Sequence, residues 1–130
     1  MMTTITPQQA LEQIKSGHLS QLKGLDAYDF THIFDGANKV LLLTYYLNGQ
    51  DTPAAIIKEK ESEIRRYAEN AKGAMLQLVC GKNHDLLMYE MNVINTVNDL
   101  FPESTGFAWD VEHSESTNFK LRIDLYVIIE

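Results

Sequence analysis

The segment near the end of the chain constrains the fold most strongly. Between residues 119 and 127, apolar side chains alternate with polar or amphipathic ones. The apolar series is Phe119, Leu121, Ile123, Leu125 and Val127, and the series between them is Lys120, Arg122, Asp124 and Tyr126. A period of two places the two series on opposite faces of a β-strand. The pattern predicts a strand over residues 119–129 with one buried face and one wet face, so the fold must contain a sheet.

Other segments supply further strands and the helices that cover them. Strands are predicted at Val40–Leu47, Ala74–Val79 and Gly106–Val111 from their content of strand-forming residues. Helices are predicted from Thr6 to Gly17, from Tyr28 to Phe34, from Asp51 or Thr52 to about Ala68, and from Asp85 to Phe101. The two long helices are expected to pack on the sheet through Ile57, Ile64, Met91, Ile94 and Val97. The fold class is therefore α+β: one four-stranded mixed sheet packed by helices and preceded by short N-terminal helices.

Local signals mark the helix ends. Thr6, Pro7 and Gln9 form the pattern of a capping box with proline in the first turn. Asp51 or Thr52 is expected to cap the helix that Pro53 opens.

Composition excludes several classes of protein. The 130 residues are 45% hydrophobic, which suits one folded domain and not a disordered chain. A formal net charge of −7 argues against a nucleic-acid binder. The sequence shows no signal peptide and no apolar run long enough to cross a membrane. With a single cysteine, Cys80, the chain is expected to be cytoplasmic, without a nucleic-acid or membrane partner.

The residues by themselves indicate no active site. All seven glycines are isolated, so no glycine-rich loop could hold a phosphate, and no cofactor is predicted. Cys80 is interpreted as a structural thiol with only His84 near it in sequence. The four histidines, at positions 18, 32, 84 and 113, lack the spacing of metal ligands, so no metal site is predicted. Glu112, His113 and Glu115 are interpreted as a solvated acidic turn.

Asp26 and Asp29 stand three residues apart at the expected start of the helix from Tyr28 to Phe34. Carboxylates are favoured at this position because they cap the free N–H groups and face the positive end of the helix dipole. Helix capping is the interpretation that these residues alone support.

Four segments in the same order resemble the C-terminal domain of FtsZ, the bacterial tubulin homologue. Leu25–Phe34 (LDAYDFTHIF) is similar to the family's synergy loop, and VLLLTYYLNG followed by DTPAA is similar to its next strand, turn and helix. Ala71–Asn92 and Leu121–Ile128 resemble two later segments of the domain, with Arg122 at the family's arginine position. The resemblance divides the chain into an N-terminal helical segment, residues 1–24, and an FtsZ C-terminal-like domain, residues 25–130. The glycine-rich GTP-binding domain of the family has no counterpart in the sequence.

The resemblance implies a protein-interaction domain that is not an enzyme on its own. Its partners would be FtsZ, another tubulin-like protein or a second copy of itself, and its role would be to modulate or cap FtsZ polymers in cell division. The interacting residues would be Gly24, Leu25, Asp26, Tyr28 and Asp29. In the family, aspartates of this loop act on the nucleotide of the next subunit, which implies a role in trans for Asp26 and Asp29.

Two alternatives stay open. The same α+β architecture resembles the chorismate-mutase-like fold, whose members bind ligands between subunits through convergent arginine and glutamate side chains. The chain could equally be a homo-oligomeric structural protein.

Overall fold

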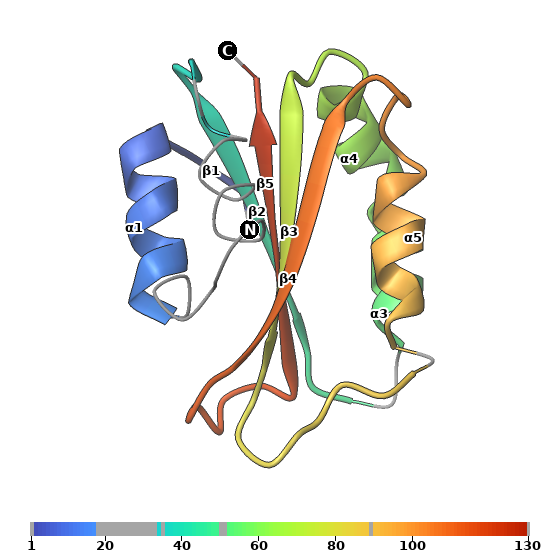
Figure 1. Cartoon of the computed structure of the whole chain (residues 1–130). Helices are drawn as coiled ribbons and strands as arrows, with labels where there is room; N and C mark the ends of the chain where they lie inside the picture. Colours follow the sequence, from blue (N-terminus) through green and yellow to red (C-terminus); the bar gives the residue numbers. More distant parts are fainter. Residues whose placement is uncertain (1, 18–33, 35, 50–51, 89, 130) are drawn as a thin grey trace.

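A computed structural model describes residues 2–17, 34, 36–49, 52–88 and 90–129. The described elements form three layers (Figure 1). A central sheet is covered by helix α1 (Pro7–Gly17) on one face. Helices α3 (Pro53–Glu59), α4 (Glu61–Ala68) and α5 (Asn92–Asn98) cover the other face.

The sheet is mixed and has five strands in the order β1-β2-β5-β3-β4. The strands are β1 (Met2–Ile5), β2 (Val40–Leu47), β3 (Gly73–Cys80), β4 (Gly106–His113) and β5 (Leu121–Ile128). Only β3 and β4 are parallel, and every other neighbouring pair is antiparallel. The four predicted strands are confirmed, but the predicted count of four is wrong because β1 adds a fifth. This short segment is held by its pairing with β2, which brings Ile5 opposite Val40.

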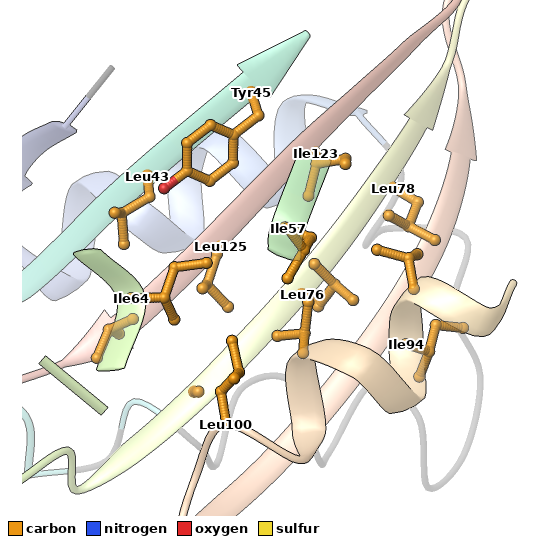
Figure 2. Packing of buried hydrophobic residues seen from close by; sticks show 14 of the residues in the cluster. Leu43, Tyr45, Ile57, Ile64, Leu76, Leu78, Ile94, Leu100, Ile123 and Leu125 are labelled. Atoms are coloured by element: carbon orange, nitrogen blue, oxygen red, sulfur yellow. The ribbon is translucent and has the colours of Figure 1, made fainter. Parts of the chain in front are cut away.

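The main hydrophobic core lies between the sheet and helices α3, α4 and α5 (Figure 2). The predicted helix over residues 51–68 is bent at Lys60, whose N–H contacts the carbonyl oxygens of Ile56 and Ile57, both at 3.1 Å. The bend divides it into α3 and α4, and both Ile57 and Ile64 are fully buried. Tyr45 of β2 donates a hydrogen bond from its hydroxyl to Glu63 of α4 at 2.9 Å. Sheet and helix layer are therefore joined by a polar contact as well as by apolar packing.

The helix predicted from Asp85 begins only at Asn92, so its predicted start is wrong. The carboxylate of Glu90, which is 1% exposed, accepts a hydrogen bond from the Leu87 backbone N–H at 3.0 Å. The Glu90 N–H donates in turn to the Leu87 carbonyl at 2.9 Å, so a hydrogen-bonded turn precedes the helix. Ile94 and Val97 are buried as predicted, whereas Met91 is only partly buried.

A second, smaller core lies on the opposite face of the sheet, towards α1. Ala10 of α1 packs there with Met75 and Tyr126, and the ring of Phe34 meets Tyr126 edge-on at 6.2 Å between centroids. The predicted wet face of the last strand is therefore wrong for two of its residues, because Asp124 and Tyr126 are both 0% exposed. Strand β5 lies between β2 and β3, and its two faces are covered by the smaller core towards α1 and by the main core under α3, α4 and α5.

The predicted caps at the starts of α1 and α3 agree with the structure. The Thr6 N–H donates to Gln9 Oε1 at 2.9 Å, and the Gln9 N–H donates to Thr6 Oγ1 at 3.1 Å. Thr52 caps α3 by accepting from the Ala55 N–H at 3.2 Å. Among the described helices, none has the length and apolar character needed to cross a membrane.

Candidate functional site

The residues predicted to interact with a partner are Gly24, Leu25, Asp26, Tyr28 and Asp29. All five lie within residues 18–33, outside the residues that the structure describes. Their roles as helix caps or as groups presented to a partner remain predictions.

The structure instead places a polar cavity of about 660 Å³ on the face of the sheet that α1 partly covers. Its lining comes from α1 and from all five strands, and includes Thr44, Gln77, Glu112, Arg122 and Asp124. Strand pairing explains how these residues meet, because Asp124 lies opposite Thr44 on one neighbouring strand and opposite Gln77 on the other. The cavity therefore gathers polar residues that are far apart in the sequence.

A buried carboxylate fixes the arginine of this cavity. Asp124 accepts a hydrogen bond from the Thr44 hydroxyl at 3.0 Å and another from Arg122 Nε at 2.9 Å. Burial raises the pKa of Asp124 above its usual range, and the neighbouring Arg122 and Thr44 oppose that rise. The guanidinium of Arg122 also lies over the ring of Phe119, with 5.6 Å from its central carbon to the ring centroid. Such an arrangement holds a guanidinium in one orientation.

The other side of the cavity carries an acidic group. Gln77 donates from Nε2 to Glu112 Oε2 at 3.0 Å, and the two residues are 1% and 7% exposed. Glu112 was predicted to lie in a solvated turn, and this prediction is wrong because β4 continues to His113. Glu112 lies two residues after Asp110, so both side chains are on the same face of β4. Extending the predicted strand by two residues, to His113, would have placed Glu112 on that face.

Chemically, the cavity can bind a small polar molecule. Among the described residues, Arg122 makes its only side-chain hydrogen bond through Nε, and the Nη groups stay available for an anionic group. Glu112 lines the same cavity as Arg122, so groups of both charge signs face it. Within the described part of the chain, no three histidine, cysteine or acidic residues are grouped so that they could hold a metal ion.

Several titratable residues also meet where β3 and β4 end. His84 Nε2 lies 3.1 Å from Glu90, and His113 Nε2 lies 3.4 Å from Asp85. Burial raises the pKa of the Cys80 thiol, and the negative charge of Glu90 adds to the effect. A thiol with a raised pKa is a weak nucleophile at neutral pH, which agrees with a structural role for Cys80.

Solved structures of the tubulin-like class have a similar fold. FtsZ of M. jannaschii, in a tryptophan-to-tyrosine variant, matches with a TM-score of 0.66 and 16% identity over 92% of this chain and 38% of its own. TubZ of Bacillus thuringiensis serovar israelensis, in a GTPγS-form protofilament, matches with a TM-score of 0.56 and 11% identity over 93% of this chain and 33% of its own. CetZ of Methanosaeta thermophila gives a TM-score of 0.50 and 14% identity over 95% of this chain and 36% of its own.

The fold of this chain is therefore FtsZ-like, and the chain spans between a third and two-fifths of the length of these proteins. No protein-family model matches the sequence, and no curated protein matches it.

Proposed function

We propose that this chain is a protein-interaction domain that docks on FtsZ or another tubulin-like protein, and that it is not an enzyme by itself. One observation carries the proposal: 92% of this chain has an FtsZ-like fold, yet the match covers only 38% of the FtsZ chain. A domain that shares part of a polymer-forming fold can bind to a subunit at the place where the next whole subunit would bind. A docked chain that offers the next subunit no binding surface would stop polymer growth there.

The docking surface that we propose is the loop from Gly24 to Phe30, with Asp26 and Asp29 reaching the nucleotide of the partner. A carboxylate in that position can orient the water that attacks a phosphoryl group. The proposal rests on the sequence resemblance of Leu25–Phe34 to the synergy loop and on the shared fold.

Co-sedimentation with FtsZ from the same organism tests docking. The chain should pellet with FtsZ polymers in the presence of GTP, and an excess of the chain should reduce polymer mass. Asp26→Asn and Asp29→Asn should remove any effect on GTP turnover while preserving helix capping, because asparagine caps about as well as aspartate. Asp99→Asn is the matched control, since Asp99 is an exposed aspartate at the end of α5. Unchanged FtsZ assembly and GTPase rate at excess wild-type chain would refute the proposal.

A second candidate function, binding of a small polar molecule, is favoured by the cavity. Arg122 and Glu112 line it together, which is the pairing expected of a chorismate-mutase-like ligand site. Thermal unfolding with a panel of small carboxylic acids tests this candidate. A ligand that stabilises the wild-type chain should lose its effect in Arg122→Lys, which keeps the charge but not the planar fork. Arg65→Lys on the exposed side of α4 is the control, and it should respond as the wild type does.

A further inference from the structure

Strand β4 forms one edge of the sheet and lacks most of the usual protections of an edge strand. Proteins protect edges with short strands, proline, lysine or inward-facing charges. β4 is eight residues long and contains neither proline nor a basic residue other than its last, His113. Its inward-facing charges, Asp110 and Glu112, lie on the cavity face, and the residues on the other face of β4, Phe107, Trp109 and Val111, carry no charge. The opposite edge strand, β1, is only four residues long.

The backbone groups on the outer side of β4 can be assigned from one hydrogen bond. The Ser114 N–H donates to the Cys80 carbonyl of β3 at 2.8 Å. Successive residues of a strand direct their N–H and C=O groups to alternate sides. The even-numbered residues of β4 therefore pair with β3, and Phe107, Trp109 and Val111 direct their backbone groups outward. No described residue forms a hydrogen bond with the backbone of these three residues, because β4 has no described strand on its outer side.

The side chains of the same three residues supply an apolar row. Phe107 and Val111 pack against the main core, and Phe107 also contacts the ring of Phe101 at 6.1 Å between centroids. Trp109, between them, is the only tryptophan of the chain and is 45% exposed. The edge thus offers free backbone groups together with a large exposed aromatic ring.

We propose that a second copy of this chain pairs with this edge, antiparallel and about a two-fold axis at Trp109. The two five-stranded sheets would join into one continuous sheet. The inference does not depend on docking to a tubulin-like protein.

The charge pattern of β4 favours this register. In an antiparallel pair, two residues that face each other have their side chains on the same side of the sheet. A two-fold axis between two successive residues would place side chains of opposite faces together. The axis must therefore lie where a residue faces its own copy. An axis at Asp110 would place two carboxylates directly opposite each other, which is destabilising. An axis at Trp109 sets the two indole rings opposite each other and each Phe107 opposite Val111 of the second copy. It also sets each Asp110 opposite Ala108, so no two acidic residues face each other.

The outward backbone groups fit the same register. Phe107, Trp109 and Val111 all become hydrogen-bonded positions of the new antiparallel ladder, and each facing pair exchanges two bonds. An interface of one strand pair is small, so we expect a reversible dimer that forms at high protein concentration.

Sedimentation velocity over a wide range of concentration tests the proposal, with the fluorescence of Trp109 recorded in parallel. The wild-type chain should pass from monomer to dimer, and its emission should move to shorter wavelength as the indole leaves water. Trp109→Lys should weaken association about tenfold, because it removes the aromatic pair and places two like charges at the axis. Trp109→Pro should abolish association, because it removes an outward N–H while the bonds to β3 remain.

Met2→Lys is the matched control, since Met2 is an exposed apolar residue on the other edge strand. It should dimerise as the wild type does. A wild-type chain that stays monomeric at every concentration overturns the proposal, as does a dimer that persists unchanged in both Trp109 variants. If those variants fail to fold, the wild-type fluorescence decides, because dimerisation without a change in Trp109 emission would place the interface elsewhere. Binding to FtsZ is measured separately by co-sedimentation, so failure of one proposal leaves the other standing.

Discussion

Replacement of Gly81 by alanine should destabilise the protein strongly. A Cβ atom at this position would lie 1.9 Å from the backbone oxygen of Phe119, whereas real Cβ contacts are essentially never shorter than 3.0 Å. The two segments must therefore separate by about 3.0 − 1.9 = 1.1 Å. The obstructing atom belongs to the backbone, so no side-chain rotation can relieve the clash.

The expected magnitude follows from what that separation disturbs. The Gly81 N–H donates to the Lys120 carbonyl at 2.8 Å, and the Lys120 N–H donates to the Leu47 carbonyl at 3.0 Å. Overpacking costs about 1–3 kcal/mol, and a weakened backbone hydrogen bond adds about 0.5–1.5 kcal/mol. We expect Gly81→Ala to lower the free energy of unfolding by about 2–4 kcal/mol. The urea midpoint, followed by circular dichroism, should fall by about 1–3 M.

Alanine variants of two other glycines show how much of the effect comes from a steric clash and how much from backbone strain. Gly36 has a φ of 75°, and no atom of the described residues lies within 4 Å of the position that a Cβ would take, so Gly36→Ala should cost the left-handed penalty of about 1–2 kcal/mol. Gly106 has no positive φ, and a Cβ built there would have no described neighbour within 4 Å. Gly106→Ala should therefore be neutral or stabilising by up to about 1 kcal/mol. A Gly81→Ala variant as stable as Gly106→Ala would refute the reasoning.

Three further predictions concern the buried carboxylate, the core and nucleotide binding. Because burial raises the pKa of Asp124, the folded state binds its proton more tightly than the unfolded state. The stability of the wild type relative to Asp124→Asn should therefore fall as pH rises above about 4, the pKa of an unfolded aspartate, and a difference that does not vary with pH would contradict this. Ile57→Ala should cost about 2–5 kcal/mol in urea unfolding, since Ile57 is fully buried between α3 and the sheet. Calorimetric titration of the isolated chain with GTP and magnesium should show no heat beyond dilution, and micromolar binding would reveal a phosphate site without a glycine-rich loop.

The sequence determined those features that depend on neighbouring residues. The bounds of β2 agree with the prediction to the residue, because Val40–Leu47 is a continuous run of strand formers. The caps at Thr6 and Thr52 were predictable because a capping side chain bonds to a backbone group three residues away. The buried positions Ile57 and Ile64 followed from helical periodicity.

The candidate site was only partly predictable. Arg122 could be singled out as the one arginine on a strand, but no sequence pattern linked it to Gln77 or Glu112. These residues meet because β5 lies between β2 and β3, an order that the sequence does not state. The other predicted residues, in the loop from Gly24 to Asp29, lie outside the described part of the chain.

Tertiary structure alone decided the remaining features. β1 is a strand because β2 offers it a free edge, and Asp124 is buried because both neighbouring strands and the layer around α1 surround it. Helix α5 begins at Asn92 and not at Asp85, and the buried Glu90 side chain just before it bonds to the Leu87 N–H. Periodicity and capping act over three or four residues, whereas burial and strand pairing join residues 80 or more positions apart, as in the hydrogen bond between Thr44 and Asp124. The energy of such contacts exists only once the chain has folded, so the sequence could indicate the elements but not the environment that each would meet.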